Sequence, residues 1–226
     1  MDANYFLDLS KEMNMLRKIT LTLMLLSLAA FSLAQTTFYS ESMGTVTATT
    51  TIAAHESADG FDVDSATYSG TADLRATTPS SYDGASGSAN VFFTNTVGRF
   101  LLIEGIDSSA YNSITMSLGH YKSNTAGSNE LTIEVSSDGT NWTPLTYTRP
   151  TGTGTASWIL IYPTGNIPST SNLRIRFTQT SGTPQFRIDD VKLSGFSGTP
   201  TPTISAVGIL NPFSTFTGTP SASQSY

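Results

Sequence analysis

The stretch Asn172–Thr178, NLRIRFT, has an apolar residue at every second position. Successive side chains of a β-strand point to opposite faces, so this alternation predicts a half-buried strand. Its leucine, isoleucine and phenylalanine face a core, and Arg174 and Arg176 face water on the other side.

The rest of the chain has similar short runs of apolar residues. Alternation recurs in Ser113–Leu118 and Asn129–Ser136, whereas Val91–Phe93, Phe100–Ile103 and Trp158–Tyr162 are apolar on both faces and are predicted as central strands. No window of about eleven residues or more has the 3.6-residue period of an amphipathic helix. Strands with one apolar face are commonly buried in pairs of sheets, so about ten strands predict an all-β, two-sheet antiparallel sandwich.

Composition excludes several classes of protein. The 226 residues contain no cysteine, which excludes disulfide scaffolds, cysteine nucleophiles and thiolate metal sites. The net charge of -6 argues against a nucleic acid as partner, because such proteins carry basic surfaces. Hydrophobic residues make up 38% of the chain, which is enough for a folded core.

The N-terminal segment has the pattern of an export signal. Arg17-Lys18 precedes an apolar stretch from Ile19 to Leu33, and small residues precede Gln35. We predict that residues 1–34 are an N-terminal extension and signal peptide, that cleavage precedes Gln35, and that the protein is secreted. No transmembrane segment is expected after cleavage. A membrane anchor is the less favoured alternative, because a spanning helix needs about 20 apolar residues.

Three further segments are predicted. Residues 35–195 form one sandwich, and residues 196–203 (FSGTPTPT) form a linker. Residues 204–226 begin a new apolar run that is too short for an independent sandwich. They are predicted to open a second β-domain that is truncated in this chain, and a frayed tail is the alternative.

Several phrases together carry a resemblance to a known family. They are TADLR at 71–75, YDGASGSANVFF at 82–93, NELTIEVSSDGTNW at 129–142, IPSTSNLRIRF at 167–177 and FRIDDVKL at 186–193. The chain from about Thr36 to Gly195 resembles the jelly-roll modules of secreted multidomain bacterial proteins, related in shape to carbohydrate-binding and MAM-like domains. The resemblance implies a jelly-roll sandwich and an accessory, non-catalytic role. The tail, residues 213–226, looks like the start of an immunoglobulin-like module.

The phrase FRIDDVKL contains a change of parity. Phe186 and Ile188 share one parity, whereas Val191 and Leu193 share the other. A regular strand cannot bury both pairs on one face, so we predict a β-bulge with one extra residue at Asp189-Asp190.

Adjacent carboxylates repel one another unless a cation or hydrogen-bond donors compensate, and Ca²⁺ accepts six to eight oxygen ligands. Modules of the resembled kind commonly hold a structural Ca²⁺ between the first and last strands. The resemblance therefore implies Glu41 and Asp190 as ligands, with Asp189 less favoured. In the alternative reading, Asp189 pairs with Arg187 or Lys192, and Asp190 caps a turn.

A ligand surface is predicted on the polar strand faces. Arg174 and Arg176 project from one strand, and Tyr121, Trp142 and Trp158 can offer rings to a sugar. Sugars are bound by planar stacking together with charged hydrogen bonds. We predict Arg174, Arg176 and Tyr121 as ligand-binding residues. The alternative pairs the arginines with Glu134 or Glu130 and buries both tryptophans.

No catalytic residue is predicted. The chain has no G-x-S-x-G motif, no pair of glutamates is known to converge, and His120 continues an apolar strand face. The predicted function is a secreted, non-catalytic module that binds polysaccharide or a cell-surface glycan, or acts as a spacer. The alternatives are an accessory fragment of an extracellular nuclease, phosphoesterase or glycosidase, and a purely structural adhesion protein.

Overall fold

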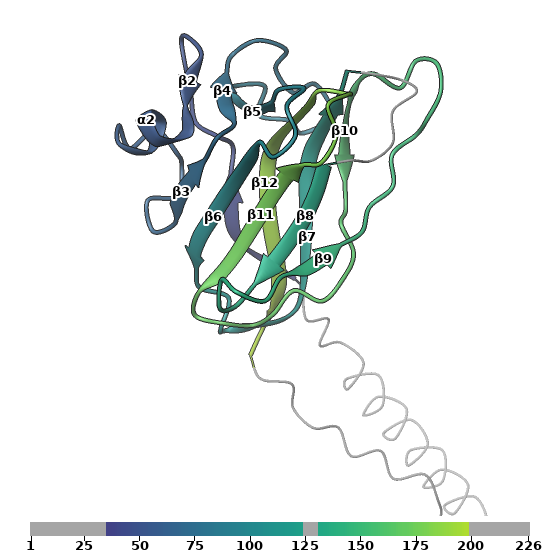
Figure 1. Ribbon diagram of the computed structural model, residues 1–226. Helices are drawn as coiled ribbons and strands as arrows, with labels where there is room; N and C mark the ends of the chain where they lie inside the picture. Colours follow the sequence, from purple (N-terminus) through teal and green to yellow (C-terminus); the bar gives the residue numbers. More distant parts are fainter. Residues whose placement is uncertain (1–34, 124–130, 199–226) are drawn as a thin grey trace, which may run out of the picture.

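Two antiparallel sheets pack face to face in the computed structural model (Figure 1), which describes residues 35–123 and 131–198. The seven-stranded sheet has the order β10 (Trp158–Ile161), β7 (Tyr111–Lys122), β12 (Phe186–Ser197), β5 (Asn90–Phe93), β4 (Asp73–Arg75) and β2 (Thr50–Thr51), and β1 (Thr36–Glu41) also pairs with β12. The five-stranded sheet has the order β3 (Thr67–Gly70), β6 (Phe100–Ile106), β11 (Leu173–Gln179), β8 (Leu131–Ser136) and β9 (Thr143–Leu145). The helix α2 (Ile52–Glu56) follows β2.

The connections are those of a jelly roll. From β5 to β8 each strand crosses to the opposite sheet, and β10, β11 and β12 alternate between the sheets in the same way. The predicted two-sheet antiparallel jelly-roll sandwich is confirmed.

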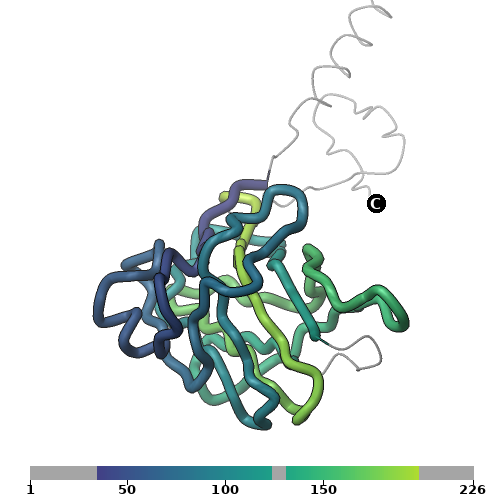
Figure 2. Tube along the Cα trace, turned by 90° about the horizontal axis from the view of Figure 1, so that it is seen from above, coloured from purple at the N-terminus to yellow at the C-terminus, as the bar shows by residue number. Residues whose placement is uncertain are grey.

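The ends of the sandwich lie together. Thr36 pairs with Gly195, and Figure 2 shows the two ends of the described domain side by side. Strand β12 continues to Ser197, two residues beyond the predicted domain end. The predicted signal peptide, residues 199–203 of the linker and the predicted immunoglobulin-like start lie outside the described residues.

The core lies between the sheets and follows the alternation in the sequence. Leu173, Ile175 and Phe177 of β11 are buried, whereas Arg174 and Arg176 are half-exposed. The three strands predicted to be central differ in burial and in their position in the sheet. Strand β5 is buried on both faces, but the outer face of β6 is half-exposed. Strand β10 lies at a sheet edge, so its prediction as a central strand was wrong.

The predicted bulge is present in β12. Asp189 pairs with Gly119 of β7 and Lys192 pairs with Ser117, so β12 has one extra residue here. Asp190 has a φ of 50°, in the left-handed region. As a result Ile188 and Val191, which flank the two aspartates, are both fully buried in the core.

Candidate ligand-binding site

A groove lies on the outer face of the five-stranded sheet. Its volume is about 460 Å³, within the usual range for ligand clefts. Its lining residues come from β6, β11, β8 and the segments that flank them: Gly98, Phe100, Thr132, Glu134, Arg176, Thr178 and Thr180.

Strand register brings these residues together. Thr178 of β11 pairs with Phe100 on one side and with Thr132 on the other. Two residues along the same face, Arg176 lies opposite Glu134. The groove therefore has one half-buried aromatic ring, several hydroxyls and one pair of opposite charges.

The charged pair is well defined. Nε and Nη2 of Arg176 both donate to Oε2 of Glu134, at 3.1 and 2.8 Å. The side chains are 33% and 23% exposed, so water reaches both. The guanidinium carbon also lies 4.0 Å from the ring centroid of Trp142, a cation–π contact that holds the arginine in place.

Trp142 is positioned by the hairpin between β8 and β9, which turns at Asp138-Gly139. Asp138 accepts hydrogen bonds from the backbone N–H groups of Thr140 and Asn141, and Gly139 has a φ of 74°. The indole N–H donates to the carbonyl of Gly139. The ring is half-exposed, so the alternative that buries both tryptophans holds only for Trp158, which is 7% exposed.

Arg174 shares this face but does not line the groove. Its Nε donates to Glu104 at 2.9 Å, and its Nη1 donates to the carbonyl of Ser137. The guanidinium lies against Gly139, where an added Cβ would come within 3.2 Å of Nε. Arg174 therefore supports the hairpin that carries Trp142.

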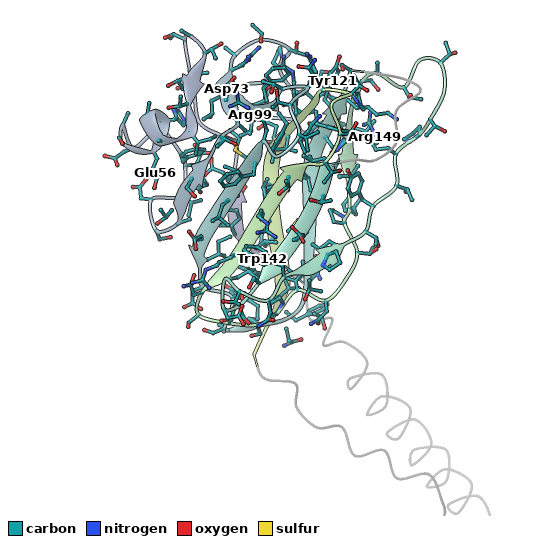
Figure 3. All side chains as sticks on the ribbon, viewed as in Figure 1. Glu56, Asp73, Arg99, Tyr121, Trp142 and Arg149 are labelled. Carbon is teal, nitrogen blue, oxygen red and sulfur yellow. The ribbon has the colours of Figure 1, made fainter. Side chains whose placement is uncertain are left out.

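Tyr121 is on the opposite side of the molecule. It pairs in register with Arg187 of β12 and Trp158 of β10, on the outer face of the seven-stranded sheet. Its ring centroid is 5.7 Å from that of Trp158. Figure 3 shows Tyr121 and Trp142 towards opposite ends of the sandwich. The three predicted ligand-binding residues therefore do not form a single site.

Glu41 points between the sheets. It is fully buried, and its carboxylate accepts hydrogen bonds from the backbone N–H groups of Met43, Asp62 and Val63 and from the hydroxyl of Tyr68 on β3. Burial raises the pKa of Glu41, and these donors oppose that rise.

Asp189 and Asp190 point the other way. Asp189 accepts from the hydroxyls of Ser80 and Ser86, and Asp190 accepts from the hydroxyl of Tyr82 and the N–H of Ser86. These donors belong to the loop between β4 and β5, which covers the outer face of the seven-stranded sheet. Burial raises the pKa of Asp189 to about 7, with a smaller contribution from the neighbouring charge of Asp190.

The side chains present do not fit one calcium shell. Glu41 is on the inner face of the seven-stranded sheet, whereas Asp189 and Asp190 are on its outer face. All three carboxylates already accept hydrogen bonds from hydroxyl or backbone N–H groups of the protein. Within residues 35–123 and 131–198, no three His, Cys, Asp or Glu side chains are placed to hold a metal ion. The alternative pairing of Asp189 with Arg187 or Lys192 is not observed either: Arg187 donates to Thr77 and Asn90, and no ion pair among the described residues joins Lys192 to Asp189. Calcium binding stays a prediction without support from this geometry.

Sequence reasoning missed part of the groove. Phe100, Thr132 and Thr178 occupy outward positions of their strands, which parity alone could have identified. Parity does not say which strands are neighbours or in what register, so these residues could not be grouped before the sheet order was known.

No family model and no curated protein matches the chain. Similar solved structures include CBM35 from Cellvibrio japonicus Abf62, with 17% identity, a TM-score of 0.41, and coverage of 59% of this chain and 95% of that one. The CBM22-1 xylan-binding domain from Paenibacillus barcinonensis Xyn10C has 14% identity, a TM-score of 0.39, and coverage of 74% and 98%. TmCBM61, solved with beta-1,4-galactotriose, has 19% identity, a TM-score of 0.35, and coverage of 57% and 86%. Because these identities and TM-scores are low, the jelly-roll fold is assigned from the sheet topology described above.

Proposed function

We propose that this domain binds carbohydrate in the groove on the outer face of β6, β11 and β8. The observation that carries the proposal is the arrangement of Phe100, the Arg176–Glu134 pair and threonine hydroxyls around one hollow of about 460 Å³. Apolar rings stack on the C–H faces of sugars, while charged donors and acceptors bind their hydroxyls. The cation–π contact with Trp142 keeps the side chain of Arg176 in position.

The domain is proposed to be non-catalytic. Glycoside hydrolysis commonly uses two carboxylates that flank the scissile bond, one of them as an acid or base. On this face, Glu134 is in an ion pair with Arg176, and Glu104 is in an ion pair with Arg174. Neither carboxylate stands ready as a proton donor or a nucleophile.

Secretion as part of a larger extracellular protein completes the proposal. Its support is the basic and apolar N-terminal pattern in the sequence. Within the described part of the chain, no helix has the length and apolarity needed to cross a membrane.

The test is affinity electrophoresis and calorimetry of the mature chain with a panel of soluble polysaccharides. We expect at least one polymer to bind, and Arg176→Ala to weaken its binding about tenfold or more, as expected for the loss of a charged hydrogen bond. Arg75→Ala is the matched control, because Arg75 also forms an ion pair, with Asp73, and a cation–π contact, with Phe92, but it lies in β4 of the other sheet. Failure of every polymer to bind, or equal losses in the two variants, would contradict the proposal.

A further inference from the structure

The Arg176–Glu134 pair uses only part of its hydrogen-bonding capacity. Both N–H groups that Arg176 contributes, on Nε and Nη2, go to the same atom, Oε2 of Glu134. Among the described residues, no hydrogen bond involves Nη1 of Arg176 or Oε1 of Glu134. A donor and an acceptor are therefore left over on two side chains that line the groove.

The two unused atoms belong to the same ion pair, with Nη1 on the side of the guanidinium away from Oε2, because Nε and Nη2 both face that oxygen. Nη1 shares its carbon with Nη2, and Oε1 shares its carbon with Oε2, while Nη2 and Oε2 are 2.8 Å apart. A hydroxyl group can donate and accept at once. Two hydroxyls on adjacent sugar carbons can together span from this donor to this acceptor, one hydroxyl accepting from Nη1 and the other donating to Oε1.

The charges in the groove select against an anionic sugar. Arg176 and Glu134 are the charged residues among those that line it, and their charges cancel. A uronate carboxylate would have to compete with Glu134 for the same guanidinium and would be repelled by it. The whole chain carries a net charge of -6, which adds to that repulsion.

We propose that the groove recognises a neutral polysaccharide through a vicinal diol, with Nη1 of Arg176 as donor and Oε1 of Glu134 as acceptor. Phe100 contacts the apolar face of the same or the next sugar residue. This inference rests on the proposed carbohydrate-binding function and names the substrate class of that site.

The experiment compares polymers with and without a pair of adjacent free hydroxyls. Residues of 1,4-linked glucan, mannan and galactan keep adjacent free hydroxyls at carbons 2 and 3, whereas internal residues of 1,3-linked glucan keep no adjacent pair. Polygalacturonate has the diol and also a carboxylate. We expect the best 1,4-linked neutral polymer to bind at least about tenfold more tightly than the 1,3-linked glucan and the uronate polymer. We expect little change between low and high salt, because no net charge is neutralised.

Two variants test whether Glu134 contributes to the binding. Glu134→Ala should weaken binding about tenfold or more. Asp73→Ala, which removes the carboxylate of the Arg75–Asp73 ion pair in the other sheet, should leave it unchanged. Equal binding to 1,3-linked glucan, a preference for polygalacturonate, or unchanged binding by Glu134→Ala would overturn the diol inference while the proposed function stands. No binding to any polymer would overturn the proposed function itself.

Discussion

His120 shows at the scale of one residue how an ionisable group is kept neutral in the core. Its ring is fully buried on β7 and packs against Tyr147 and Phe186 at centroid distances of 5.2 and 5.4 Å. Neither ring nitrogen has a hydrogen-bond partner among the described residues. Burial, with smaller contributions from the charges of Arg149 and Lys122, lowers the pKa of His120 to about 3. The prediction that His120 continues an apolar strand face is therefore confirmed, and its burial leaves two ring nitrogens without hydrogen bonds.

This arrangement predicts a pH dependence of stability. The pKa of His120 is lower in the folded state than in the unfolded state, where it lies near 6.5. The unfolded state therefore binds more protons as pH falls from about 6.5 to about 3, and stability is lost over that range by up to about 1.4 kcal/mol per pH unit.

The variant His120→Phe should remove this contribution. We expect its urea midpoint to match or exceed that of the wild type at pH 7.5, because a ring of similar shape leaves no unpaired nitrogen. Its advantage should grow as the pH falls towards 4. Tyr121→Phe, on the next position of the same strand, should show no such trend. A parallel pH dependence in wild type and His120→Phe would contradict the assignment.

At the scale of elements, the bulge in β12 determines what the outer face can hold. The bulge turns Asp189 and Asp190 outward together, where both anchor the loop between β4 and β5. The ring of Tyr82 in that loop packs against Gly119, the register partner of Asp189. A Cβ on Gly119 would come within 2.6 Å of the Tyr82 ring, so the loop requires glycine there.

We expect Gly119→Ala to destabilise the domain by about 1–3 kcal/mol through overpacking. In Tyr82→Ala the ring is absent, and adding Gly119→Ala to that variant should cost far less than it does in the wild type. Chemical denaturation of the four proteins measures this coupling. Ser117→Ala, also on β7, serves as the control. Additive losses would show that the ring and the glycine do not interact.

The same elements show how far sequence reasoning reaches. Parity in FRIDDVKL was enough to predict the bulge, because burying Ile188 and Val191 on one face leaves no other solution. Parity also predicted that Arg174 and Arg176 face water. It could not predict that Arg176 pairs with Glu134 while Arg174 supports a turn, because that depends on register between strands distant in sequence. It also could not predict that Glu41 and Asp190 face opposite sides of one sheet.

At the scale of the whole molecule, the question is what ties the first strand to the rest. Glu41 at the end of β1 accepts hydrogen bonds from the segment after it and from Tyr68 on the opposite sheet, and the Tyr68 hydroxyl is also 3.0 Å from that of Tyr39. These bonds join β1 to β3 and to the segment between α2 and β3.

We therefore expect the melting temperature of the mature protein to be the same in calcium and in excess chelator. Tyr68→Phe, which removes one donor from a buried carboxylate, should lower stability by about 1–3 kcal/mol in both conditions. Differential scanning calorimetry with native mass spectrometry checks both points. A bound ion together with a fall in melting temperature on chelation would instead support the calcium prediction.

The pairing of Thr36 with Gly195 also decides how the domain responds to force. Both ends of the domain lie at the same end of the antiparallel β1–β12 pair. Tension applied between them therefore breaks the hydrogen bonds between these strands one after another, instead of shearing all of them together. We therefore expect β1 and β12 to separate at low force, beginning at Thr36 and Gly195. The groove on β6, β11 and β8 lies on the other sheet and would keep its shape while the first strand peels away.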